Sequence, residues 1–183
     1  MSKFSTWVGA ARLRTLPLSI SGIIVGSSIA AQQGQFNLVI FSLALGTTLG
    51  LQILSNFAND YGDGVKGTDN EDRIGPMRAL QSGIITQKEM LRAMVITAVA
   101  TLILAVLLIY ASFEDENWLA ALVFLILGIG AIVAAIKYTV GNSAYGYRGR
   151  GDIFVFILFP LLNSFTLVKL LSKIHCAADL MVL

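Results

Sequence analysis

Residues 36–58 read FNLVIFSLALGTTLGLQILSNFA and carry no charged side chain. An apolar run of about 20 residues is long enough to cross the hydrocarbon core of a bilayer as a helix. Residues 59–78 follow directly and read NDYGDGVKGTDNEDRIGPMR, a stretch that holds five of the chain's eleven carboxylates. Because carboxylates are costly at the edge of a bilayer, their concentration at the end of this helix indicates a functional site.

The composition of the 183-residue chain is that of a membrane protein, with 56% apolar and 13% charged residues. Five apolar stretches are candidate spans: Leu16–Ala31, Leu38–Ala58, Ala93–Phe113, Trp118–Val140 and Ile153–Leu171. Each must be helical, because lipid offers no hydrogen-bond partner to an open strand edge. The sequence therefore predicts an all-α fold, a multi-pass transmembrane helix bundle of about five spans.

The basic residues are concentrated on one side of this arrangement. Those up to residue 150 lie before the first span, between the second and third, or between the fourth and fifth: Lys3, Arg12, Arg14, Lys66, Arg73, Arg78, Lys88, Arg92, Lys137, Arg148 and Arg150. The positive-inside rule then predicts that the N-terminus and the Asp-rich loop are cytoplasmic. The net charge of +2 gives no indication of a nucleic-acid partner. A cleaved signal peptide ending near Ser28-Ile29-Ala30 is the alternative for the start, but the charge pattern favours a retained first span.

The second span carries a polar stripe toward its charged end. Gln52, Asn56, Asp60 and Asp63 recur at spacings of four, four and three, so on a helix they share one face. Gln52 lies about 200° from Gly50, which belongs to a row of small residues suited to close helix packing. One side of this helix is therefore expected to pack against a neighbour, and the other to line a polar cavity.

The residues that follow predict where this helix ends and the next begins. Glycines at positions 62, 64 and 67 indicate an end near Asp63, with Asp69 returning toward the polar stripe from a loop. Thr86 and Glu89 have the spacing of a capping box, so the third long helix is predicted to begin there.

The acidic loop allows three interpretations. The first is a solvated connector, which does not require acids aligned with polar residues inside a span. The second is a calcium loop, because Asp60 and Glu71 stand twelve positions apart inclusively, but Val65 occupies the position where such a loop requires glycine. The third is a site for magnesium and a diphosphate. Its metal ligands would be Asp60, Asp63 and Asp69, and its phosphate contacts would be Lys66, Arg73 and Arg78.

Three segments, in this order along the chain, resemble one family of membrane enzymes. They are Trp7–Leu18 with Arg12 and Arg14, Asn59–Arg78 with its patterns N-D-Y-G-D-G-x-x-G-x-D and D-R-x-G-P-x-R, and Lys137–Asp152 with Tyr145-Gly146-Tyr147. Together they resemble the UbiA superfamily of intramembrane prenyltransferases, and are most similar to its 1,4-dihydroxy-2-naphthoate polyprenyltransferases of menaquinone biosynthesis. The resemblance covers residues 5–159.

The resemblance implies transfer of a polyprenyl group from polyprenyl diphosphate to 1,4-dihydroxy-2-naphthoate with decarboxylation, giving demethylmenaquinol, in a bacterial cytoplasmic (inner) membrane. It implies Mg²⁺ as cofactor, with Asp60, Asp63 and Asp69 as catalytic metal ligands. Substrate binding is expected of Asn56, Asn59, Lys66, Arg73, Arg78, Tyr138, Tyr147, Arg148 and Asp152, with the tyrosines, Arg148 and Asp152 at the acceptor end. A Lewis acid on the leaving diphosphate and a dry cavity around the allylic cation fit this chemistry.

Beyond Phe159 the resemblance ends. Residues 1–159 are expected to form the N-terminal half of a prenyltransferase membrane domain, and residues 160–183 a divergent tail, as in a truncated or frameshifted product. The family fold has roughly nine helices with a second Asp-rich motif on a later one, so this chain alone is expected to be poorly active. Two other hypotheses stay open, a small transporter or channel subunit with an acidic cytoplasmic mouth and an inactive membrane fragment.

Overall fold

The computed structural model describes residues 2–68, 77–113, 118–142 and 144–149. Its helices are α1 (Lys3–Ala11), α2 (Leu16–Gln32), α3 (Leu38–Lys66), α4 (Gln87–Ser112) and α5 (Trp118–Lys137), with the short 3₁₀ helices η1 (Leu13–Thr15) and η2 (Gly146–Arg148). The described residues contain no strand, so the all-α prediction is confirmed.

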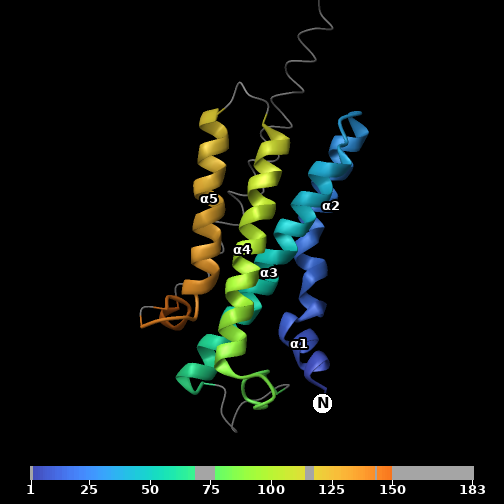
Figure 1. Ribbon diagram of the computed structural model, residues 1–183. Coiled ribbons are helices and arrows are strands. Elements are labelled where there is room, and N and C mark those ends of the chain that lie inside the picture. Colours follow the sequence, from blue (N-terminus) through green and yellow to red (C-terminus); the bar gives the residue numbers. More distant parts are fainter. Residues whose placement is uncertain (1, 69–76, 114–117, 143, 150–183) are drawn as a thin grey trace, which may run out of the picture.

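Four helical segments are long and apolar enough to cross a membrane: Lys3–Gln32, Leu38–Lys66, Gln87–Ser112 and Trp118–Lys137. They confirm the first four predicted spans, whereas the fifth, residues 153–171, lies outside the described residues. α3 is the central element, because it packs against α1, α2, α4 and α5 (Figure 1). No residue of α2 or α5 is fully buried, which suits helices whose outer faces meet lipid rather than water.

Helix α3 uses its two faces differently, although only Asp63 of the predicted polar stripe lines the pocket formed by the described residues. Gly46 and Gly50 face α4, and a β-carbon at Gly50 would lie 2.3 Å from Thr101 Oγ1. On the polar side, Gln52 Oε1 accepts a 2.7 Å hydrogen bond from Ser19 Oγ in α2. The small residues therefore permit close packing on α4. Three residues of the polar stripe, Gln52, Asn56 and Asp60, meet the N-terminal helices and the corner between them, whereas Asp63 meets Tyr147 after α5.

The predicted end of α3 near Asp63 is wrong by one turn. The helix continues to Lys66 and ends where Gly67 adopts φ 69°, the left-handed conformation that glycine tolerates. Gly62 and Gly64 do not break the helix, because their missing side chains admit Thr139 and Leu80 instead. The predicted start of α4 is confirmed, since Thr86 and Glu89 form the reciprocal hydrogen bonds of a capping box.

The corner between α1 and α2 is fixed against α3. Arg12 has φ 52° and ψ 59° at the end of α1, and Asn56 Nδ2 donates a 2.9 Å hydrogen bond to Ala11 O. The Trp7 and Phe57 rings meet edge to face with centroids 5.5 Å apart. The buried apolar core lies at this same end of the bundle: Ala10, Leu54, Phe57, Ala58, Ala79, Ile85, Met90 and Met94.

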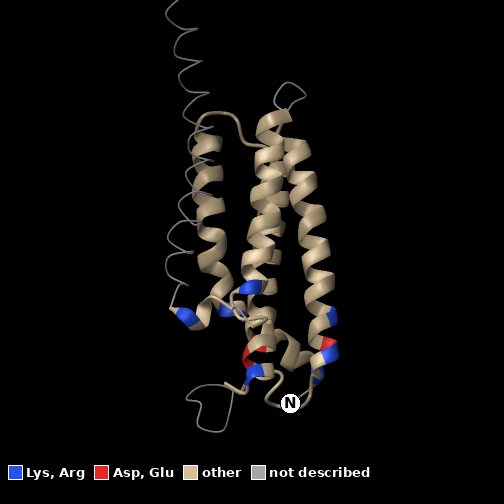
Figure 2. Cartoon of the chain, turned by 90° about the vertical axis from the view of Figure 1, so that its left-hand side faces the viewer, with Lys and Arg blue, Asp and Glu red and all other residues tan. Residues whose placement is uncertain are grey.

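Charged residues of the described chain gather at one end of the bundle, which also holds the N-terminus (Figure 2). Tyr110 and Trp118 lie near the other ends of α4 and α5 and are highly exposed, as expected of aromatic residues at a membrane interface. This distribution agrees with a bundle that crosses the bilayer with its charges on one side. That this side is the cytoplasmic one stays a prediction.

Candidate functional site

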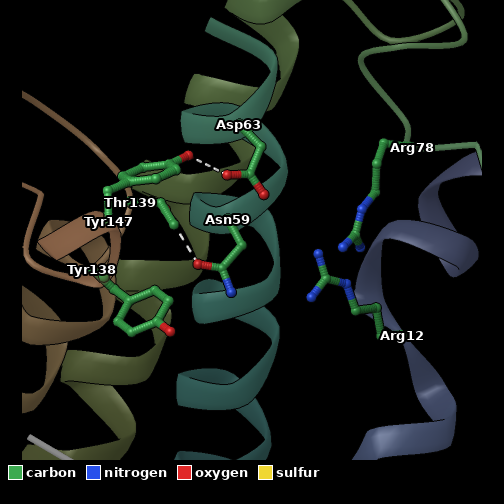
Figure 3. Close-up of a pocket in the computed structure, with 8 residues that line it drawn as sticks. Arg12, Asn59, Asp63, Arg78, Tyr138, Thr139 and Tyr147 are labelled. Carbon is green, nitrogen blue, oxygen red and sulfur yellow. Dashed lines mark hydrogen bonds between the residues drawn. The ribbon is translucent and has the colours of Figure 1, made fainter. Parts of the chain in front are cut away.

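A pocket of about 200 Å³ opens at the charged end of the bundle. Its walls come from the corner after α1, the last turns of α3, the segment before α4 and the segment after α5 (Figure 3). The lining residues are Arg12, Asn59, Asp63, Arg78, Tyr138, Thr139, Gly146 and Tyr147. Five of these were predicted from the sequence as site residues, and the fold brings them together from segments up to 88 positions apart.

Asp60 is the most buried acid of the described chain and is held by two arginines. It is 1% exposed, and its Oδ1 accepts from Arg12 Nη2 at 2.6 Å and pairs with Arg78 Nη1 at 3.3 Å. A carboxylate taken out of water needs such partners, because an unpaired buried charge is strongly destabilising. Both guanidinium groups also line the pocket, so they stand between the buried acid and the open space.

Asp63 lies one turn further along α3 and faces the opposite wall of the pocket. Its Oδ1 accepts a short hydrogen bond from Tyr147 OH and a 3.4 Å one from Thr68 Oγ1. Lys66 Nζ lies 4.0 Å from the centroid of the Tyr147 ring, within the range of a cation–π interaction. These contacts join the segment after α5 to the end of α3.

Thr139 fixes the segment after α5 against α3 at the level of Asn59. Its hydroxyl lies 2.8 Å from Ala58 O and 3.2 Å from Asn59 Oδ1, and both oxygens can accept its single proton in turn. The approach is close because α3 has glycine at position 62, where a β-carbon would lie 2.6 Å from Thr139 O. The pocket wall therefore depends on the absence of a side chain as much as on those present.

Tyr138 and Tyr145 pack against each other in the segment after α5. Their rings meet at 85° with centroids 5.4 Å apart, and Tyr145 OH donates a 2.7 Å hydrogen bond to Ala134 O. Burial, and secondarily the neighbouring Tyr138, raises the pKa of the Tyr145 phenol above its ordinary value. The two rings are therefore closely packed in the segment that supplies Tyr138 to the pocket wall.

The other predicted site residues are placed differently. Asn56 is buried beneath the pocket on Ala11, and Arg148 is exposed outside the pocket lining. Asp69, Arg73 and Asp152 lie outside the described residues. Sequence reasoning missed Arg12, Thr139 and Gly146 as pocket residues. A basic residue just before the first span, on the same predicted side as the Asp-rich loop, was the available signal for Arg12.

The chemistry of the pocket suits a divalent cation and an anion together. Asp60 and Asp63 offer carboxylate oxygens, the ligands that Mg²⁺ prefers, one helical turn apart. Arg12 and Arg78 offer planar guanidinium groups, which match phosphate and carboxylate oxygens. No group of three His, Cys, Asp or Glu side chains close enough to hold a metal occurs among the residues that the structure describes. Two carboxylates beside substrate oxygens nevertheless fit the way Mg²⁺ is commonly bound.

The fold and the pocket define an integral membrane protein with a pocket lined by charged and polar side chains at one end of a helix bundle. Comparison with known proteins agrees with this class: residues 19–169 match the UbiA prenyltransferase family, and the chain belongs to that family.

Several curated relatives are similar over most of the chain. The chain is 49% identical over 164 residues to a 1,4-dihydroxy-2-naphthoate octaprenyltransferase of Escherichia coli (strain K12). The matched region covers 89% of this chain and 52% of the relative. Proteins of the same name from Haemophilus influenzae and Mycobacterium tuberculosis are 47% and 37% identical, over 88% and 87% of this chain and 52% and 51% of their own lengths. The chain therefore spans about half the length of these relatives. No solved structure gives a significant match.

Proposed function

We propose that this chain forms the diphosphate-binding half of a prenyltransferase that joins a polyprenyl group to 1,4-dihydroxy-2-naphthoate in menaquinone biosynthesis. The observation that carries the proposal is the meeting of two acids of α3 with two arginines at the mouth of a membrane bundle. The buried Asp60 is paired with Arg12 and Arg78, and both arginines line the same pocket as Asp63. The names of the relatives, which share up to 49% identity with it, supply the substrates of the proposal.

The residues of the pocket divide between the two substrates. Arg12, Arg78 and Lys66, with Arg73 outside the described residues, would neutralise the diphosphate as the C–O bond to the allylic carbon breaks. Mg²⁺ held by Asp60 and Asp63, with Asp69, would supply Lewis-acid assistance to the leaving group. The prenyl chain would lie among the apolar helices in the membrane, where it remains out of water.

The acceptor would enter from the side of the segment after α5. Tyr138 and Tyr147 place aromatic rings in the pocket wall, a surface suited to a flat naphthoate ring, and Asn59 offers a polar contact. A new C–C bond forms at the ring carbon that carries the carboxylate, which then leaves as CO₂. Arg148 and Asp152 are proposed as outer contacts of this acceptor end.

The transporter hypothesis is less well supported than the enzyme. Ion paths through a bilayer require polar or ionisable groups at the depth of the membrane. In the described residues the charged side chains lie at one end of the bundle and not midway along the helices (Figure 2).

Binding of the prenyl donor tests the proposal directly. The full chain in lipid nanodiscs would be unfolded thermally with Mg²⁺ and geranyl S-thiolodiphosphate, a donor analogue that resists ionisation. At 100 times its Kd, a ligand specific for the folded state adds about 2.7 kcal/mol of stability. We expect this stabilisation to require Mg²⁺ and to be lost in Asp60→Asn and Asp63→Asn.

Glu89→Gln is the matched control, because Glu89 is a carboxylate at the same end of the bundle that pairs with Lys3 and lies outside the pocket lining. It should retain the full effect of the analogue. Equal stabilisation of Asp60→Asn, Asp63→Asn and the control, or stabilisation without Mg²⁺, would contradict the proposal.

A further inference from the structure

Arg12 is held in an unusual backbone conformation at the point where it reaches the pocket. It has φ 52°, the only positive φ of a non-glycine residue in the part of the chain that the structure describes. Side chains with a β-carbon pay a strain energy there, and such residues are concentrated at functional sites. A second contact also holds this corner against α3, the 2.9 Å hydrogen bond from Asn56 Nδ2 to Ala11 O.

The guanidinium of Arg12 has more donors than its present partner uses. Arg12 Nη2 donates to Asp60 Oδ1 at 2.6 Å, while the buried Arg12 Nε has no hydrogen-bond partner among the described residues. A buried donor left without an acceptor destabilises the folded state. Since Arg12 lines the pocket, an anion bound there could supply the missing acceptor.

The buried Asp60 must have a cation beside it in every state of the site. The structure provides two on the same oxygen, with Arg12 the closer at 2.6 Å and Arg78 at 3.3 Å. A divalent ion at Asp60 would compete with Arg12 for this carboxylate and repel its guanidinium, while a diphosphate would attract it. The two ligands therefore act on Arg12 in the same direction.

We propose that Arg12 is a substrate-binding residue that exchanges partners, holding Asp60 when the pocket is free of ligand and donating to the diphosphate once a divalent cation binds Asp60. The exchange rests on the proposed function of the pocket. It makes the binding of the metal and of the diphosphate cooperative, because each ligand favours the same position of Arg12. Linkage requires the coupling to be equal in both directions.

The test measures two affinities in Arg12→Gln and Arg12→Lys chains in nanodiscs. Mn²⁺ replaces Mg²⁺, so that free metal can be counted by electron paramagnetic resonance, and geranyl S-thiolodiphosphate is the anion. Removing the positive charge in Arg12→Gln should tighten Mn²⁺ binding without the analogue by roughly threefold to tenfold, because a competitor for Asp60 is lost. It should weaken analogue binding at saturating Mn²⁺ by about tenfold or more, the effect of losing a charge-assisted hydrogen bond.

Opposite changes in the Mn²⁺ affinity and the analogue affinity of Arg12→Gln identify the exchange. Chelation of Mn²⁺ by the analogue in solution is the same for every variant, so it does not affect the comparison. Arg12→Lys keeps the charge without the planar fork, so its Mn²⁺ affinity should stay near that of the unchanged protein while the analogue binds less tightly. If Arg12→Gln weakens both ligands together, Arg12 is a structural tie and the exchange is overturned. An unchanged Mn²⁺ affinity in Arg12→Gln overturns the exchange as well.

A second readout uses the unchanged sequence and does not depend on the folding of a variant. In a chain with ¹⁵N-labelled arginine, the proton chemical shift of Arg12 Nε–H, assigned by the loss of its signal in Arg12→Lys, should move downfield when Mg²⁺ and the analogue are both added, because the donor then gains a charged acceptor. An unchanged chemical shift overturns the exchange. If the unchanged chain binds no analogue with Mn²⁺ present, the proposed function itself fails and the exchange with it, whereas analogue binding without these signatures refutes the exchange alone.

Discussion

Replacing Gly62 with alanine perturbs the contact on which the pocket wall depends. A β-carbon at this position would lie 2.6 Å from Thr139 O and 2.7 Å from Thr139 C, and both of these are backbone atoms. A side-chain rotation cannot relieve such a contact, so α3 and the segment after α5 must separate. Overpacking of this kind costs about 1–3 kcal/mol, against a gain of about 1 kcal/mol from the better helix propensity of alanine.

Gly128→Ala is the matched control, because Gly128 is also helical and a β-carbon there would meet no atom within 4 Å. The unfolding free energy of both variants can be measured by titration with dodecyl sulfate in mixed micelles, followed by the fluorescence of Trp7 and Trp118. We expect Gly62→Ala to be less stable than the control by about 1–3 kcal/mol. Equal stability of the two variants would refute the packing argument.

The same substitution links packing to the site. Thr139 and Asn59 both line the pocket and share a 3.2 Å hydrogen bond across the contact. Separation of the two segments should therefore weaken binding of the prenyl diphosphate analogue in Gly62→Ala, while Gly128→Ala leaves the affinity unchanged. Full affinity in Gly62→Ala would show that the pocket does not depend on this close approach.

Two further substitutions test the corner after α1 and the segment after α5. Asn56→Ala removes the buried donor to Ala11 O, so we expect the unfolding free energy in the same titration to fall by about 1–3 kcal/mol. A fall below about 0.5 kcal/mol, the usual size for a surface substitution, would contradict the role of that hydrogen bond. Burial raises the pKa of Tyr145 in the folded chain above its unfolded value of about 10, so the stability it contributes is fully present below that pH and is lost as the pH rises through the folded pKa. Stability measured between pH 8 and 12 should accordingly fall more steeply for the unchanged chain than for Tyr145→Phe, and parallel curves would count against this assignment.

The position of the spans was predictable because transfer into lipid depends on local composition. Helices α2 to α5 begin and end within a few residues of the predicted spans, apart from the helical turns that extend α3 and α4 into the polar region. The capping box at Thr86 and the polar stripe on α3 were predictable for the same reason, since each depends on residues within one or two turns.

The end of α3 shows where local reasoning stops. Gly62 and Gly64 have the composition of a helix end, but α3 continues because the neighbouring segments fill the space that their side chains would occupy. Whether a glycine breaks a helix or admits a neighbour depends on what packs against it, and the sequence around it does not contain that information.

The sequence alone determined a membrane helix bundle with acids aligned at one end. Its hydropathy and the helical spacing of its polar residues both depend on residues that are neighbours along the chain. Only the tertiary structure decided that Arg12, 48 positions before Asp60 in the sequence, is its closest ionic partner, and that Thr139 closes the wall beside Asn59. Contacts between distant segments depend on how the helices pack, and the free energy of packing is a property of the whole bundle.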